Sequence, residues 1–211
     1  MLKTKNIRKV YMAEKDFENS ILIKEKFKQV FGVRFIPFLE FENEKIKKKT
    51  LFFCKRALKK QLIEEKEKWL GIFLKKEMST NFLPSITIKW LGLRKEYGVF
   101  AKKDLTAMTY IGEYTGIVRK RRSYLDKRNA YCFEYLYARG EKSPFVIDAK
   151  EQGNHTRFIN HSNKPNLALQ LIFFDKMMHI GLFTSCFVSK DTELTYDYGI
   201  SYWKKREKPI D

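Results

Sequence analysis

Two short segments in the second half of the chain contain the residues best suited to chemistry. Residues 157–162 read RFINHS, which includes the pair Asn160 and His161, and residues 193–199 read ELTYDYG, which includes Tyr196 and Tyr198. The first segment offers amide and imidazole groups, and the second offers phenols in an apolar setting. This combination suggests a site that transfers a methyl group to the amine of a lysine.

Lysine methylation makes demands that tyrosines can meet. The reacting amine must be neutral, yet a free lysine has a pKa of about 10.4, so its deprotonation at pH 7 costs about 4–5 kcal/mol. A dry aromatic channel and a nearby sulfonium cation both disfavour the ammonium form. The remaining work is alignment and the exclusion of water, and oxygen atoms can steer a methyl group through weak C–H···O contacts. Neither a metal nor an acid–base histidine is required.

The elements that would position these segments change in character near Pro84. Before it, residues 10–31 are spaced as an amphipathic helix that stops near Gly32, and a second helical pattern runs from the N-cap Asn43 towards Lys76. Gly71 weakens the later part, so two helices fit as well as one. The apolar face of this second pattern would consist of Ile46, Phe53, Ala57, Leu62, Trp69 and Phe73.

After Pro84 the pattern is that of short strands separated by turns. Strands are predicted at residues 86–90, 97–101, 110–118, 145–148 and 167–173, and residues 119–129 are compatible with a short helix. We therefore expect an α+β protein in three parts. These are a basic, mainly helical region (1–84), a strand-rich domain (85–203) and a short basic tail (204–211).

The strand-rich region resembles the SET domain, the fold of many protein lysine methyltransferases. The match rests on the order of YGVFA (97–101), GEYTG (112–116), YCF (131–133), IDA (147–149), GN (153–154), RFINHS, PN (165–166) and ELTYDYG. Each piece is weak alone, but their order is specific. The resemblance implies several small sheets, with RFINHS threaded beneath ELTYDY as a pseudoknot, an exception to the usual unthreaded chain. It also implies S-adenosylmethionine as cofactor.

The resemblance also implies roles for individual residues. Tyr198 would be the catalytic tyrosine, and Tyr114 would line the lysine channel with Phe133. Tyr196 stands where SET enzymes carry Phe or Tyr, and its hydroxyl would crowd the channel and favour mono- or dimethylation. The implied cofactor contacts are Tyr97, Gly98, Tyr131, Arg157, Phe158, Asn160, His161, Tyr198, Tyr202 and Trp203. The alternative interpretation of the aromatic residues is simple core packing.

The chain departs from the family pattern in two ways. The first motif reads Glu96-Tyr97-Gly98 where relatives show Gly-x-Gly, so we expect the loop to shift and cofactor affinity to be affected. Zinc-binding cysteine clusters, which flank the domain in many chromatin-type members, are missing, because the three cysteines are scattered. This compact, cysteine-poor form resembles the SET proteins of chlamydiae and other intracellular bacteria. The cysteines are Cys54, Cys132 and Cys186.

Composition limits the class of protein. The scattered cysteines indicate a reducing compartment and disfavour a disulfide framework or a thiolate metal site. No apolar run reaches the roughly 18 residues of a membrane span, and the N-terminus lacks a secretory signal. We expect a soluble protein of cytoplasmic or nuclear type, or a bacterial effector that leaves the cell by a non-classical route and acts in a host nucleus. Metal ligation by His155, His161 and His179 is not expected.

The net charge of +18 suggests an acidic partner. Lysines and arginines between 45 and 60 are either a solvated helix face or a contact with nucleic acid. The expected substrates are lysine-rich proteins such as histones or histone-like DNA-binding proteins, whose repulsion by the chain would be offset by acids around the groove. Those acids would be Glu113, Glu134, Asp148, Glu193 and Asp197. A methyltransferase of a non-histone protein and a non-catalytic nucleic-acid-binding protein on a SET-like scaffold remain alternatives.

Overall fold

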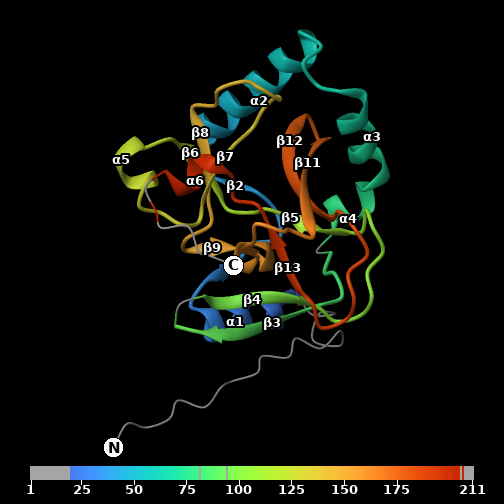
Figure 1. Ribbon diagram of the computed structural model, residues 1–211. Helices are drawn as coiled ribbons and strands as arrows, with labels where there is room; N and C mark the ends of the chain where they lie inside the picture. The colour runs from blue at the N-terminus through green and yellow to red at the C-terminus, as the bar shows by residue number, and fades with distance from the viewer. Residues whose placement is uncertain (1–19, 81, 94, 205, 207–211) are drawn as a thin grey trace, which may run out of the picture.

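A computed structural model describes residues 20–80, 82–93, 95–204 and 206 (Figure 1). The N-terminal part consists of α1 (Ser20–Phe31), β1 (Arg34–Phe35), β2 (Glu40–Phe41), α2 (Glu44–Lys59), α3 (Glu65–Phe73) and α4 (Lys75–Ser79). The rest consists of β3 (Ile86–Gly92), β4 (Glu96–Ala101), β5 (Tyr110–Glu113), β6 (Ile117–Lys120), α5 (Ser123–Asp126), β7 (Cys132–Glu134), β8 (Phe145–Asp148), β9 (Gln152–Gly153), the 3₁₀ helix η2 (His155–Phe158), β10 (Asn160–His161), β11 (Leu167–Phe174), β12 (Met177–Thr184), β13 (Glu193–Tyr196) and α6 (Ile200–Trp203). Among these elements, no helix has the length and apolar composition that crossing a bilayer requires.

The predicted helix boundaries are partly confirmed. α1 ends at Phe31, just before Gly32, while residues 10–19 of that predicted helix lie outside the described residues. The side chain of Asn43 accepts a hydrogen bond of 3.0 Å from the backbone N–H of Ile46, which is the expected N-cap. The second pattern breaks between α2 and α3, where Gln61 has a φ of 57°, and does not break at Gly71.

Gly71 instead brings α3 close to β11. A Cβ atom at this position would lie 2.0 Å from the carbonyl oxygen of Phe173, so only glycine permits the approach. The contact turns the face with Glu67 and Gly71 inward. The prediction that Trp69 and Phe73 belong to the apolar core is therefore wrong, since these side chains are 65% and 82% exposed.

Four small sheets make up the strand-rich region, which confirms the predicted α+β class. Their strand orders are β10-β13-β4-β3, β11-β12-β5, β2-β6-β8-β7 and β1-β9. The strand predicted at 110–118 is two strands, β5 and β6, that belong to different sheets. β1 pairs with β9 and β2 pairs with β6, so the N-terminal part contributes edge strands to these sheets. A domain boundary near residue 84 stays a prediction.

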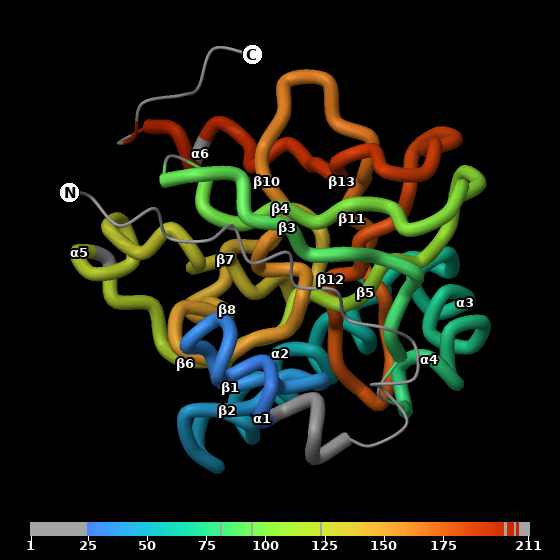
Figure 2. The backbone as a smooth tube through the Cα atoms, turned by 90° about the horizontal axis from the view of Figure 1, so that it is seen from below, coloured from blue at the N-terminus to red at the C-terminus, as the bar shows by residue number. Residues whose placement is uncertain are grey.

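The two chemically promising segments lie side by side. β10 pairs in parallel with β13, with Asn160 opposite Thr195 and His161 opposite Tyr196. Figure 2 shows β10, β13 and β4 together on the same side of the molecule as α6. Parallel neighbours need a long connection between them, and here it contains β11 and β12. This pairing is the arrangement that the expected pseudoknot requires.

Candidate active site

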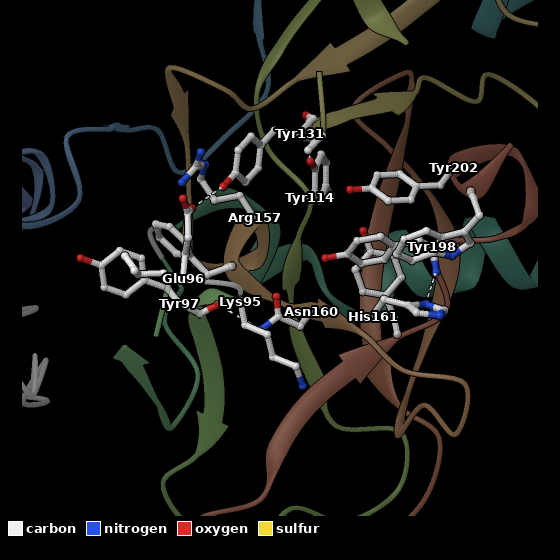
Figure 3. A pocket seen from close by; sticks show the side chains of 15 residues that line it. Lys95, Glu96, Tyr97, Tyr114, Tyr131, Arg157, Asn160, His161, Tyr198 and Tyr202 are labelled. Carbon is white, nitrogen blue, oxygen red and sulfur yellow. Dashed lines mark hydrogen bonds between the residues drawn. The ribbon is translucent and has the colours of Figure 1, made fainter. Parts of the chain in front are cut away.

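A pocket of about 500 Å³ opens beside β10, between β4, the segment before β7 and α6. This volume lies within the range of about 300–1,000 Å³ that small-molecule sites occupy. Its walls consist of Leu93, Lys95, Glu96, Tyr97, Tyr114, Ala130, Tyr131, Arg157, Phe158, Asn160, His161, Tyr196, Tyr198, Tyr202 and Trp203. Figure 3 shows Glu96, Tyr131 and Arg157 gathered on one side, and His161, Tyr198 and Tyr202 on the other. The structure thus brings most of the sequence-predicted residues together.

Two predicted site residues do not line this pocket. Phe133 packs beside Tyr114, with ring centroids 5.3 Å apart, and so supports the wall. Gly98 allows the side chain of Asn160 to approach β4, because a Cβ atom at Gly98 would lie 3.2 Å from its Nδ2 and 2.8 Å from Oε1 of Glu193. Both residues therefore act on the pocket through a neighbour.

Sequence reasoning missed other residues on the wall. Leu93, Lys95 and Ala130 were not predicted, and Glu96 was noted only as a departure from the family pattern. All four are close in sequence to Tyr97 or Tyr131, and this proximity is the feature of the sequence that could have indicated their place on the wall.

Tyr198 holds its hydroxyl group in a fixed direction. The hydroxyl donates a hydrogen bond of 2.8 Å to the backbone oxygen of Ile159, and the backbone N–H of Tyr198 donates to Nδ1 of His161 at 3.2 Å. The ring lies 4.7 Å from that of Tyr196 and 4.6 Å from that of Tyr202, centroid to centroid. Because its proton is committed to Ile159, the hydroxyl oxygen keeps lone pairs that can accept from a ligand.

The three tyrosines of the predicted channel remain neutral near pH 7. Burial raises the pKa of Tyr114, Tyr196 and Tyr198 well above the usual range. The hydroxyl of Tyr114 donates 3.0 Å to the backbone oxygen of Tyr131, which ties the channel wall to the segment before β7. Neutral phenols cannot take a proton from an ammonium group at this pH. Their contribution is limited to hydrogen bonding, packing and the exclusion of water.

Asn160 and His161 use their polar groups in different ways. Nδ2 of Asn160 donates to the backbone oxygen of Tyr97 at 3.0 Å and to Oε1 of Glu193 at 2.8 Å, so it joins β10 to β4 and β13. Nδ1 of His161 accepts from the backbone N–H of Tyr198, so Nε2 is the ring nitrogen that carries a proton.

Two buried N–H groups on the pocket wall are left without a partner among the described residues. They are Nε2 of His161 and Nε1 of Trp203, whose rings lie 4.7 Å apart, centroid to centroid. A buried donor without an acceptor is costly, and native structures rarely leave one unpaired. A bound group with acceptor atoms and a flat ring would satisfy both donors and pack against the aromatic wall. An adenosyl group has both features, so the pocket fits S-adenosylmethionine.

Arg157 holds the opposite wall together. Its Nε donates 2.8 Å to the backbone oxygen of Ala149, and its guanidinium lies 4.0 Å from the centroid of the Tyr131 ring. The hydroxyl of Tyr131 in turn donates to Oε2 of Glu96 at 3.3 Å. This chain of contacts connects η2 with the start of β4 across the segment before β7.

Glu96 keeps the backbone conformation that favours a glycine. Its φ is 56°, in the left-handed region, so the residue that replaces the first glycine of the motif adopts a strained conformation. Its side chain lines the pocket and accepts the hydrogen bond from Tyr131. The exchange of glycine for glutamate thus adds a carboxylate to the wall at the cost of backbone strain.

A matched pair of substitutions measures this strain. Glu96→Gly should be more stable to unfolding than Glu96→Ala by about 1 kcal/mol, because both remove the carboxylate and only the glycine relieves the left-handed backbone. Urea unfolding monitored by circular dichroism gives the two free energies. Equal stabilities, or a less stable glycine variant, would contradict the strain.

None of the five acids expected around the groove lines the pocket. Two of them lie behind the pocket wall, where Glu193 accepts from Asn160 and Asp197 lies 3.5 Å from Nδ1 of His161. Glu113 is buried and pairs with His179 at 2.6 Å, and Asp148 pairs with Arg119 at 2.8 Å. Among the described residues, no three His, Cys, Asp or Glu side chains converge as the ligands of a metal ion would.

Comparisons with known proteins identify the strand-rich region. The model of the SET domain family matches residues 96–199. The histone-lysine N-methyltransferase SETD2 of Mus musculus is 33% identical over 119 residues, which are 54% of this chain and 5% of that protein. The putative histone-lysine N-methyltransferase ASHH4 of Arabidopsis thaliana is 36% identical over 113 residues, or 48% of this chain and 30% of that protein.

A solved structure supports the fold. A humanized mutant of the Chaetomium thermophilum Polycomb Repressive Complex 2, bound to the inhibitor GSK126, superposes with a TM-score of 0.50 and 21% sequence identity. The match covers 58% of this chain and 16% of that chain. In all three comparisons the chain spans less than a third of the relative's length.

Proposed function

Residues 96–199 of this chain belong to the SET domain family, and we propose that the protein is an S-adenosylmethionine-dependent protein-lysine N-methyltransferase. The observation that carries the proposal is the meeting of three neutral tyrosines, Tyr114, Tyr196 and Tyr198, at one pocket. When bound, S-adenosylmethionine supplies a methyl group on a positively charged sulfur. The chain must bind the two reactants, orient them and keep out water.

The cofactor is assigned to the wall with the unpaired donors. His161 and Trp203 would donate to acceptor atoms of the adenosyl group, and Tyr202 would add an aromatic surface. Arg157 would keep Tyr131 in place at the opposite wall. Tyr97, Phe158 and Asn160 complete the proposed cofactor site, and Gly98 contributes by letting Asn160 approach.

The lysine side of the site is assigned to the neutral tyrosines. A wall of buried aromatic rings makes the surroundings of an ε-amine dry, and this favours its neutral, nucleophilic form. Tyr198 would align the methyl group, because its hydroxyl oxygen keeps acceptor capacity while its proton is held by Ile159. Tyr114, supported by Phe133, would close the channel against water.

The hydroxyl of Tyr196 is assigned the control of the methylation state. It is buried, with its ring against that of Tyr198, so it reduces the space for an amine that already carries methyl groups. We therefore propose mono- or dimethylation. Tyr196→Phe should raise the proportion of the higher methylated products several-fold, as measured by mass spectrometry of the product ladder.

Tyr137→Phe is the control for this substitution. Tyr137 is also buried, and its hydroxyl donates to Glu141 outside the pocket. The substitution therefore removes the same chemical group from a different place. Its product ladder should match that of the wild type. An unchanged ladder in Tyr196→Phe would reject the assignment.

The proposed substrates are lysine-rich proteins, with histones or histone-like DNA-binding proteins first. The support is that the curated relatives named above are histone-lysine N-methyltransferases. A histone substrate would have the protein act in a nucleus, and a bacterial histone-like substrate would have it act in a bacterial cell. A non-histone protein is the alternative substrate.

Transfer of label from S-adenosylmethionine tests the activity. The protein is incubated with methyl-labelled cofactor and either core histones or a bacterial histone-like protein, and label should appear on lysines of one of them. Total cellular protein serves as a third substrate. If the protein bound the cofactor but labelled none of these three substrates, a non-catalytic SET-like scaffold would be favoured. Absence of cofactor binding would refute the proposed site itself.

A further inference from the structure

α2 carries an excess of positive charge that the fold does not use. Its sixteen residues include seven lysines and arginines but one acid, Glu44. The cations are Lys45, Lys47, Lys48, Lys49, Lys55, Arg56 and Lys59. Within the part of the chain that the structure describes, none of them forms a salt bridge. Two acids in the segment before α2 are already engaged, since Glu40 pairs with Arg34 and Glu42 with Arg122.

Helix stability does not explain this composition. α2 is held by an inward face of Ile46, Thr50, Cys54 and Ala57, which are buried. Lys45 and Lys47 lie in the first turn, where the helix dipole favours acids instead. Pairs of like charge three or four residues apart, such as Lys55 and Lys59, destabilise a helix. Arg56 and Lys59, in the last turn, suit the dipole, but the lysines between 45 and 49 do not, and their presence points to a partner.

Three of these cations form an outward stripe on α2, which also carries the exposed side chain of Phe52. Lys48, Lys55 and Lys59 are separated by seven and four residues, so they share the face opposite the buried one. From Lys48 to Lys59 the stripe extends over about 16 Å at 1.5 Å per residue. In Figure 1, α2 lies at the end of the molecule opposite α1, β3 and β4, so the face is not covered by those elements.

The spacing and charge of this stripe suit a polyanion of high charge density. Duplex nucleic acid carries about one negative charge per 1.7 Å of its axis with both strands counted, so a length of about 16 Å carries roughly nine phosphate charges. We propose that the outward face of α2 binds the phosphate backbone of double-stranded nucleic acid, without reading its sequence. This would hold the protein on the nucleic acid that carries a histone or histone-like substrate, and that second role rests on the proposed function.

Salt dependence of binding tests the surface directly. Fluorescence anisotropy of a labelled duplex of about 20 base pairs is measured from 50 to 200 mM KCl, with no cofactor or protein substrate present. The variant replaces Lys48, Lys55 and Lys59 with Gln, which keeps helix propensity nearly unchanged. Each lost phosphate contact should reduce the log–log salt slope by about 0.9, so the triple variant should lose about 2.7 and bind at least about 10-fold more weakly.

A control variant removes the same charge elsewhere. Lys75, Lys76 and Lys103 are exposed and lie outside α2, so their replacement by Gln should change the slope by less than about 1. An equal loss of slope in both variants, or no binding by the wild type at 50 mM KCl, would overturn the proposal. Unlabelled competitors are then added at equal charge concentration. If polyglutamate or anionic vesicles displaced the labelled duplex as effectively as unlabelled duplex does, the proposal would also be overturned. Because the assay needs no methyl transfer, its failure is distinct from failure of the proposed enzyme activity.

Discussion

Tyr198→Phe is expected to lower the rate of methyl transfer by about 10²–10³-fold, the size of effect that loss of one well-placed polar group has in other active sites. The substitution removes the one hydroxyl that is fixed by Ile159 and faces the pocket. The ring and its contacts with Tyr196 and Tyr202 remain, so the pocket should keep its shape. Cofactor affinity, measured by isothermal titration calorimetry, should change by less than about threefold. The loss should therefore appear in kcat, which identifies an interaction made in the transition state.

Tyr110→Phe separates this effect from a general loss of packing. Tyr110 is a buried tyrosine outside the pocket, and its hydroxyl donates to Sδ of Met78 at 3.3 Å. Its substitution removes the same atom from a similar environment and should leave kcat within about twofold of the wild type. If both variants lost activity equally, Tyr198 would have no special place in catalysis. A loss of cofactor binding in Tyr198→Phe would instead assign this tyrosine to binding alone.

The pocket was predictable because short ordered motifs carry it. RFINHS and ELTYDYG are far apart in the chain, and their meeting depends on the parallel pairing of β10 with β13. Periodicity alone does not predict such a pairing, since a strand of two residues has no period. The order of the motifs implied the SET fold, and that fold predicted the contact between the two segments. The roles given to the individual residues stay predictions.

The errors have local physical causes. On α3, apolar periodicity placed Trp69 and Phe73 inside, but the close approach of Gly71 to Phe173 turned a different face inward. β12 was not predicted, because nearly all of its side chains are buried and the alternation that marks a half-exposed strand is missing. In each case tertiary contacts outweigh the local preference.

His155 is expected to make the protein less stable at acidic pH. It is buried, its Nε2 bonds to the backbone oxygen of Ile111 at 2.8 Å, and its Nδ1 has no partner among the described residues. Burial lowers the pKa of His155 from 6.5 to about 4. Between these values the unfolded chain binds a proton that the folded protein does not. The free energy of unfolding should therefore fall as the pH falls from 6.5 to 4, by up to about 3 kcal/mol.

His179 acts in the opposite direction and at higher pH, so it adds no slope between pH 6.5 and 4. Burial disfavours its charged form, but the Glu113 carboxylate, 2.6 Å away, raises the pKa of His179 above 6.5 overall. The stability that this pair contributes is present below pH 6.5 and is lost as the pH rises through the folded pKa. On acidification, the wild type thus loses stability at His155 while it keeps that of the His179–Glu113 pair.

Substitution of His155 isolates its contribution to the loss of stability on acidification. His155→Gln should be less stable than the wild type at pH 7, yet it should lose less stability between pH 7 and 4.5, because glutamine does not titrate. Urea unfolding at both pH values gives the difference. Tyr110→Phe is the control, since burial raises the pKa of Tyr110 far above this window and its substitution changes no proton uptake. Between pH 7 and 4.5 that variant should lose as much unfolding free energy as the wild type, even if its absolute stability differs. If His155→Gln lost as much stability as the wild type between pH 7 and 4.5, the inference that His155 is neutral in the folded protein would be wrong.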